Sequence, residues 1–125
     1  REVMLKTLLT FLIMLTAPHI YAQSNCDLPT TDIGFKVIIN DVSDEISEDD
    51  KLSKSKDLVS EACLTTNQIK QLLEVITYES YKVEFAKFAY QYCFDPINYD
   101  SIYDEFSFSS STEELKVFIQ SQNKE

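Results

Sequence analysis

The stretch Ile69-Lys70-Gln71-Leu72-Leu73-Glu74-Val75-Ile76 decides the fold. Its apolar residues Ile69, Leu72, Leu73 and Ile76 are spaced at i, i+3, i+4 and i+7, which places them on one face of an α-helix. Apart from Val75, the positions between them are polar. The segment is therefore predicted to be an amphipathic helix with one buried stripe.

The same spacing occurs twice more, once before and once after this segment. The two further stripes are Phe35, Ile38, Ile39, Val42 and Tyr99, Ile102, Tyr103, Phe106. A second apolar series follows each stripe after a short turn: Leu52, Leu58, Val59, Ala62; Val83, Ala86, Tyr90, Cys93; and Leu115, Phe118, Ile119. The sequence thus predicts an all-α fold, a short array of three helix pairs with about six helices, built from units of about 30 to 37 residues.

Stacking is what makes such units stable. One helix pair cannot bury its apolar face, whereas three stacked pairs share a continuous core. The first unit leaves an alternative open, because Val37, Ile38 and Ile39 are β-branched and follow Gly34. A short strand in that unit is the alternative to a helix.

Capping residues mark several helix starts. They are Thr65 with Gln68, Asp95 followed by Pro96, and Ser110 with Glu113 or Ser111 with Glu114. Such residues satisfy amide groups that have no partner within the helix. Acidic residues at 45–50 precede a helix expected to open near Lys51, where the helix macrodipole favours negative charge.

The amino terminus matches a secretory signal peptide. Lys6 precedes the apolar run 11–15, and Pro18 and Ala22 follow, which is the three-part pattern of an export signal. We expect residues 1–23 to be cleaved after Ala22 or Gln23. The mature chain is then secreted or periplasmic, with no membrane association after cleavage. It comprises an irregular segment with the first helix (24–50) and a helical domain (51–125). Lipid attachment at Cys26 is the less favoured alternative, because Asn25 is not the small residue that lipidation requires.

Composition excludes several classes of function. Residues 24–125 contain 9 lysines and 20 acidic residues, a net charge of −11. The only arginine, Arg1, and the only histidine, His19, lie in the expected signal peptide. The mature chain therefore has no imidazole for catalysis or metal binding and no guanidinium for phosphate. Its charge also argues against a nucleic-acid partner.

An ordered series of motifs resembles a bacterial family known only as domain of unknown function 4476. The motifs are Cys63-Leu64-Thr65-Thr66-Asn67-Gln68-Ile69, Tyr81-Lys82-Val83-Glu84-Phe85-Ala86-Lys87-Phe88-Ala89-Tyr90, Asp95-Pro96-Ile97-Asn98-Tyr99, Phe106-Ser107-Phe108-Ser109-Ser110-Ser111, Glu114-Leu115 and Ile119. The match covers residues 49 to 121. The resemblance implies a small helical domain in exported proteins, and it assigns no catalytic residue.

The three cysteines predict one disulfide in an oxidising compartment. A disulfide needs Cα atoms within about 7 Å, whereas equivalent positions on packed helices lie about 8–10 Å apart. A flexible partner is therefore required, and Cys26 lies in an irregular stretch. We expect Cys26 to pair with Cys63 and Cys93 to be a buried free thiol. Without a neighbouring His or Arg, Cys93 is not expected to be reactive.

Two oxygen-rich stretches are candidates for metal sites. The acidic run 41–50 fails the EF-hand pattern, because Ile46 and Leu52 occupy the places of the required glycine and closing glutamate. A solvated acidic turn is the preferred interpretation. The second stretch contains Asp95, Asn98 and Asp100, and capping already explains Asp95 and Asn98. The sequence therefore predicts no metal ligand and no cofactor.

Tyrosines supply the candidate binding residues. In a small helical array most aromatic side chains belong to the core, and a phenol at the rim reaches partners or water. The residues that we assign to a possible binding rim are Tyr78, Tyr81, Tyr92 and Tyr99.

The leading functional hypothesis is an exported, non-enzymatic helical module that binds an unidentified protein or peptide or orders a longer assembly. One alternative is a small hydrolase that uses a pair of carboxylates alone. Another is an acidic protein that binds cations.

Overall fold

The computed structural model describes residues 26–124, and within that range it contains six helices and no strand longer than a single bridge. The helices are α2 (Asp32–Ser43), α3 (Glu48–Glu61), α4 (Thr66–Val75), α5 (Glu79–Tyr90), η2 (Pro96–Glu105) and α6 (Ser109–Gln122). The predicted all-α fold is confirmed. The first unit is an α-helix and not a strand.

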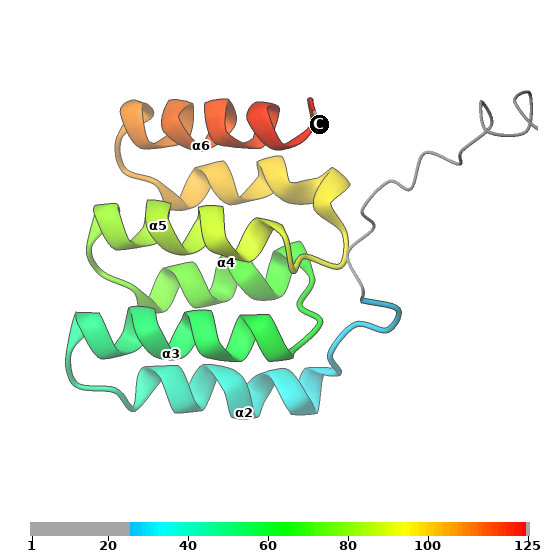
Figure 1. Cartoon of the computed structure of the whole chain (residues 1–125). Coiled ribbons are helices and arrows are strands. Elements are labelled where there is room, and N and C mark those ends of the chain that lie inside the picture. The colour runs from blue at the N-terminus through cyan, green and yellow to red at the C-terminus, as the bar shows by residue number, and fades with distance from the viewer. Residues whose placement is uncertain (1–25, 125) are drawn as a thin grey trace, which may run out of the picture.

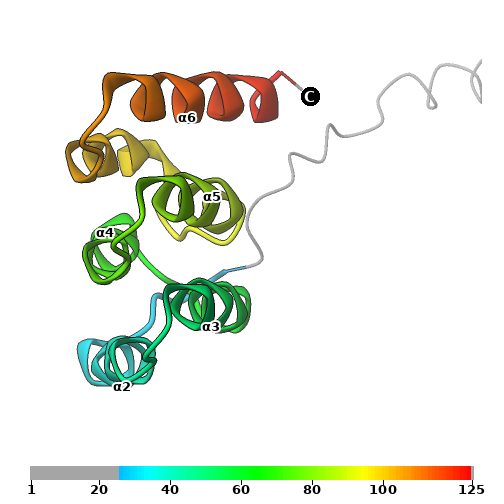
Figure 2. The ribbon, with the colours of Figure 1, turned by 90° about the vertical axis from the view of Figure 1, so that its left-hand side faces the viewer.

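Successive helices run back and forth and form three pairs, α2–α3, α4–α5 and η2–α6 (Figure 1). The pairs stack in two layers. In the view of Figure 2, α2 and α4 lie on one side and α3 and α5 on the other. One layer continues from α4 to η2 and the other from α5 to α6, because these helices contact each other. The predicted array of three helix pairs is therefore present.

Local capping explains where the first three helices begin. The hydroxyl of Thr31 accepts the Gly34 amide at 3.1 Å at the start of α2, and Ser47 caps α3 in the same way. The predicted capping box of Thr65 and Gln68 is present at the start of α4. Helix α3 opens at Glu48, earlier than the expected start near Lys51.

The third stripe forms a 3₁₀ helix, η2, in place of the expected α-helix. Because a 3₁₀ helix has three residues per turn, Tyr99 and Ile102 face the same side, and both are buried. Tyr103 and Phe106 are half-buried and pack against the edge of the core. Pro96 occupies the start of η2, as the sequence indicated.

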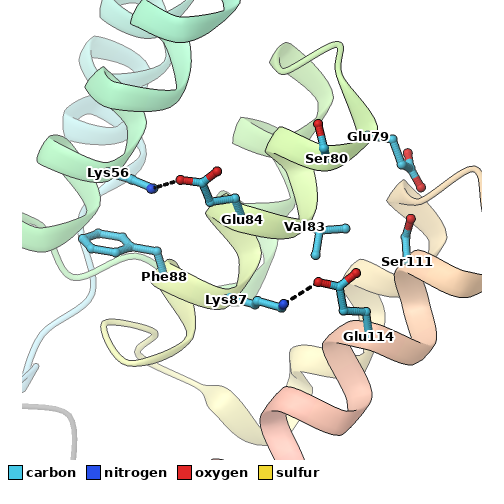
Figure 3. Close-up of a pocket in the computed structure, with 9 residues that line it drawn as sticks. All are labelled: Lys56, Glu79, Ser80, Val83, Glu84, Lys87, Phe88, Ser111 and Glu114. Carbon is cyan, nitrogen blue, oxygen red and sulfur yellow. Dashed lines mark hydrogen bonds and ion pairs between the residues drawn. The ribbon is translucent and has the colours of Figure 1, made fainter.

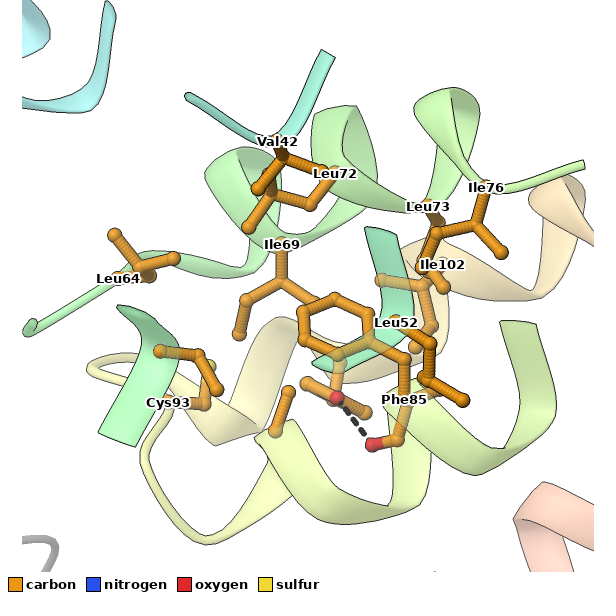
Figure 4. Close-up of a cluster of buried hydrophobic side chains, with 14 of the residues drawn as sticks. Val42, Leu52, Leu64, Ile69, Leu72, Leu73, Ile76, Phe85, Cys93 and Ile102 are labelled. Carbon is orange, nitrogen blue, oxygen red and sulfur yellow. Dashed lines mark hydrogen bonds between the residues drawn. The ribbon is translucent and has the colours of Figure 1, made fainter. Parts of the chain in front are cut away.

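The core lies between the two layers and is centred on α4 (Figure 4). All four residues of the stripe that predicts α4 are buried. Helix α5 is buried on a wider face than predicted, since Phe85 and Ala89 join Val83 and Ala86 in the interior. The reason is its central position, because α5 contacts α3, α4 and α6.

The expected signal peptide lies outside the described residues. Among residues 26–124, no helix has both the length and the apolar character that a bilayer span requires.

Candidate functional site

The stack has two edges, at which different sets of turns gather. The turns within the helix pairs, residues 44–47, 76–78 and 106–108, form what we call the turn edge, which faces the viewer in Figure 2. Residues 26–31, 62–65 and 91–95 form the opposite edge, which we call the disulfide edge. The two edges hold neighbouring units together by different chemistry.

A disulfide and backbone pairing join the first two units at the disulfide edge. Cys26 is bonded to Cys63, with Cα atoms 5.5 Å apart, and this is the pair that the sequence favoured. The Thr30 amide donates to the Cys63 carbonyl at 2.7 Å beside it. The next pair of units has a comparable bond, in which the Phe94 amide donates to the Leu64 carbonyl at 2.8 Å.

Cys93 is a free thiol in the core at this edge. Its sulfur lies 3.3 Å from the hydroxyl of Thr66. Burial raises the pKa of Cys93 to about 11, although the hydrogen bond with Thr66 opposes that effect. A thiol that stays protonated at neutral pH is a poor nucleophile, so Cys93 has a packing role here.

Asp95 caps a different helix from the one expected. It stands at the N-cap position of η2 but makes no side-chain cap there. Its carboxylate instead accepts the backbone amide of Thr66, the first residue of α4, at 2.6 Å, and accepts Asn98 at 2.9 Å. Burial on its own would raise the pKa of Asp95, but these hydrogen bonds outweigh it, and the pKa lies below its ordinary value. Asp95 therefore ties the third unit to the second.

At the turn edge, Glu48 reaches from the first unit to the second. Its carboxylate accepts the Thr77 amide at 2.7 Å and the Thr77 hydroxyl at 3.0 Å. Lys51 also donates to it at 3.0 Å. Partial burial alone would raise the pKa of Glu48, but the hydrogen bonds from Thr77 and Lys51 dominate and hold the pKa below its ordinary value.

Glu79 repeats this arrangement one unit later. It accepts the Phe108 amide at 3.1 Å, across the same separation of 29 residues that joins Glu48 to Thr77. Ser111 also hydrogen bonds to Glu79, and these bonds outweigh the effect of burial and lower the pKa of Glu79. The capping boxes predicted from Ser110 or Ser111 are wrong. Helix α6 begins at Ser109 without a local side-chain cap, because Glu79 supplies a carboxylate to that turn from the preceding unit.

The acidic run 41–50 is largely paired within the protein. Asp49 accepts the hydroxyl of Tyr81, Asp50 accepts that of Ser47, and Glu45 lies 3.3 Å from Lys54. Over residues 26–124, no group of three or more His, Cys, Asp or Glu side chains is arranged to hold a metal ion.

An open groove of about 690 Å³ runs across α3, α5 and α6 (Figure 3). Ion pairs cross it at two places, Lys56 with Glu84 and Lys87 with Glu114. Val83 and Phe88 are among the apolar side chains that line the groove.

The charged residues of the groove form a repeated contact between units. Lys56 lies 5.5 Å from the ring centre of Phe88, and Lys87 lies 5.9 Å from that of Phe118. Each lysine thus pairs with a glutamate and a phenylalanine one turn apart on the next helix. This regularity assigns the groove a structural role in joining α3 to α5 and α5 to α6.

The turn edge, by contrast, exposes one large apolar side chain at each of its three turns. Ile46, Tyr78 and Phe108 are 98%, 56% and 62% exposed. Tyr78 and Phe108 occupy the N-cap positions of α5 and α6, and Ile46 directly precedes Ser47, the N-cap of α3. We call these three residues the exposed stripe.

The tyrosines predicted to form one binding rim lie in different places. Tyr78 belongs to the exposed stripe and packs against Tyr81, with ring centres 5.5 Å apart. Tyr92 lies beyond the opposite end of α5 and packs against Phe88 at 5.4 Å. The assignment of Tyr99 to the rim is wrong. Tyr99 is only 2% exposed, and its hydroxyl donates to the Ala86 carbonyl at 2.6 Å.

The residues around the exposed stripe are strongly acidic. Segments 44–51, 74–79 and 104–109 contain nine acidic residues and one lysine, Lys51. Tyr78 is among the rim tyrosines predicted from the sequence, whereas Ile46 and Phe108 are not. The feature that could have identified Ile46 and Phe108 is their position, because each lies just before the start of the second helix of its unit.

Comparison with known protein families identifies a relationship for most of the described chain. The family model described as "Domain of unknown function (DUF4476)" matches residues 29–119, a span that runs from just before α2 into α6. No curated protein and no solved structure matches the chain.

Proposed function

The chain belongs to the DUF4476 family, and from that premise we propose that it is an exported, non-enzymatic module that binds a protein partner along its turn edge. One observation carries this proposal. Three large apolar side chains are exposed at equivalent turns of three consecutive units. Exposed apolar groups that line up on one surface are typical of interaction sites, and stacked helical units commonly present such extended surfaces.

The chemistry of the groove supports a binding role over hydrolysis. Hydrolysis by two carboxylates needs one acid that stays protonated near neutral pH, which requires a raised pKa. The pKa of Glu79, which lines the groove, is lowered instead. Glu84 and Glu114 are each paired with a lysine.

Export is the second part of the proposal. The signal pattern in residues 1–23 and the disulfide between Cys26 and Cys63 both favour an oxidising compartment. We expect cell fractionation to recover the chain outside the cytoplasm, with an amino terminus at Gln23 or Ser24. A chain found in the cytoplasm with its leader intact would contradict this part.

Cross-linking in cells tests the binding part. The stripe variant, Ile46→Gln, Tyr78→Gln and Phe108→Gln, removes the exposed stripe. A matched control variant, Val37→Gln, Ile97→Gln and Val117→Gln, removes three side chains that are 58%, 89% and 56% exposed on other surfaces. Both variants must keep the helix content of the unmodified chain by circular dichroism.

We expect the unmodified chain and the control variant to cross-link to the same protein and the stripe variant to lose that product. The proposal fails if the stripe variant retains the product, or if the control variant loses it equally.

A further inference from the structure

We propose that the partner segment is a basic amphipathic helix with apolar residues one heptad apart, which lies along the turn edge with those residues on Ile46, Tyr78 and Phe108. This inference rests on the proposed function and names the chemistry of the partner. It follows from the spacing of the stripe and from the charge around it.

The spacing of the units favours a helix. Successive units are related by packed helices, α3 on α5 and α5 on α6, and packed helices lie about 8–10 Å apart. Seven residues of an α-helix rise about 10.5 Å and return to nearly the same face. An extended strand returns to one face about every 6.7 Å or 13.4 Å. A helix with one apolar side chain per heptad therefore comes nearest to the spacing expected between stacked units.

Hydrogen bonds between the turns hold the stripe in register. Glu48 accepts the Thr77 amide next to Tyr78, and Glu79 accepts the amide of Phe108 itself. Tyr81 packs beneath Tyr78 and donates to Asp49 of the first unit. The three apolar groups therefore belong to one connected edge, which limits the entropy lost when a partner docks.

The charge around the stripe indicates which class of partner binds there. The segments that flank the stripe contain nine acidic residues and one lysine. Lys54, Lys70 and Lys82 reach acidic residues or a carbonyl of these segments from outside them, and the acidic residues still outnumber the lysines. Such a surface attracts a cationic partner and repels an anionic one. A second copy of this chain, whose formal net charge is −10, and an anionic lipid surface are both disfavoured on that ground.

Synthetic helices of about 21 residues, which span three heptads, test the inference. The matched peptide has one leucine per heptad, with lysine and alanine elsewhere. A scrambled peptide has the same composition, but its leucines are distributed around the helix. A third peptide replaces every lysine of the matched peptide with glutamate. Binding to the full chain is measured by fluorescence anisotropy at two salt concentrations.

We expect the matched peptide to bind about tenfold or more tightly than the scrambled peptide, and the glutamate peptide not to bind. The stripe variant should lose this preference and the control variant should keep it. Added salt should weaken binding of the matched peptide, because screening reduces attraction between exposed charges.

Three results would overturn the inference. One is equal binding of the matched and scrambled peptides, which would mean attraction by charge alone. The second is binding of the unmodified chain, but not of the stripe variant, to vesicles of anionic phospholipid. The third is a dimer of the unmodified chain that the stripe variant cannot form.

The cross-linking experiment separates this inference from the proposed function. A cross-linked product that depends on the stripe, together with no binding of the matched peptide, would refute the partner chemistry and leave the binding function standing. Loss of stripe dependence in cells would refute the binding function itself.

Discussion

The two boundaries between units share one set of contacts and differ in one. We call the boundary between α2–α3 and α4–α5 the first and that between α4–α5 and η2–α6 the second. At both, a glutamate of one unit accepts a backbone amide of the next at the turn edge, and a backbone hydrogen bond joins the units at the disulfide edge. A lysine–glutamate pair also joins the units within the layer of α3, α5 and α6, which we call the outer layer. Within residues 26–124, only the first has a disulfide, Cys26 to Cys63. In the same range, only the second buries a tyrosine, Tyr99, whose hydroxyl donates a hydrogen bond.

The difference shows that neighbouring units can be held together in two physically distinct ways. At the second boundary, Tyr99 stabilises the contact by burying an aromatic ring and pairing its hydroxyl. At the first boundary, the disulfide restricts the unfolded chain and ties down residues that precede α2. The largest effects of mutation should therefore differ in kind between the two boundaries, while the shared contacts should give smaller and similar effects.

Removal of the Tyr99 side chain should have the largest effect. Tyr99→Ala leaves a cavity in the core, and we expect it to lower the free energy of unfolding by about 3–5 kcal/mol. Tyr99→Phe keeps the ring but removes the bond to the Ala86 carbonyl, and it should cost about 1–2 kcal/mol. Urea unfolding followed by circular dichroism measures both. Equal losses for the two substitutions would contradict a role for the ring in holding the second boundary.

Loss of the disulfide should come next. The bond closes a loop with a sequence separation of 37 residues, and the chain-entropy model gives about 3–4 kcal/mol for its contribution. We expect Cys26→Ser with Cys63→Ser to speed amide hydrogen exchange most in α2. Helix α6 should keep its relative protection, since it belongs to the second boundary. Faster exchange confined to α6 would contradict the assignment of the disulfide to the first boundary.

The glutamates of the turn edge should give smaller, matched and pH-dependent effects. Glu48→Gln and Glu79→Gln keep a hydrogen-bond acceptor but remove the charge, so each should cost about 1 kcal/mol at neutral pH. The two losses should be similar, because the two carboxylates make equivalent contacts.

The pH dependence has a defined sign. The pKa of both carboxyls is lowered in the folded protein from an ordinary value of 4.5. Their contribution is therefore fully present above pH 4.5 and is lost as the pH falls through the folded pKa. Unfolding curves of each variant and of the unmodified chain should converge as the pH is lowered below 4.5. If the difference in the free energy of unfolding between a variant and the unmodified chain stayed constant down to acidic pH, the charge of the carboxylate would not be the cause of the stabilisation.

The lysine–glutamate pairs of the outer layer should have the smallest effect. Lys56–Glu84 and Lys87–Glu114 are partly exposed, and exposed ion pairs contribute about 1 kcal/mol or less. Double-mutant cycles at low and high salt measure their coupling. We expect small couplings that shrink with salt at both boundaries. A coupling of several kcal/mol at one pair would mean that the boundaries differ in more than the disulfide and Tyr99.

The sequence contains enough information for the fold. Periodicity predicted α4 and the array of three helix pairs, and local capping rules predicted the box at Thr65 and Gln68. It did not predict the caps that Asp95, Glu48 and Glu79 provide, because each carboxylate serves an amide 29 residues away. Local capping rules consider only the residues of one helix start.

The binding surface was harder to predict. A tyrosine in a periodic stripe suits either a rim or a core, and Tyr99 takes the core because a backbone carbonyl lies within reach of its hydroxyl. Ile46 and Phe108 belong to none of the periodic apolar series that predict the helices. Their significance appears only once stacking brings the three turns to one edge.

Chemical-shift mapping by NMR shows whether the turn edge is the binding surface. The matched basic peptide is titrated into the labelled chain, and shifts of backbone amides are followed. We expect the largest changes at Ile46, Tyr78 and Phe108, with little change along the groove at Val83 and Phe88. Changes confined to the groove, with the turn edge unaffected, would contradict this assignment of the binding surface.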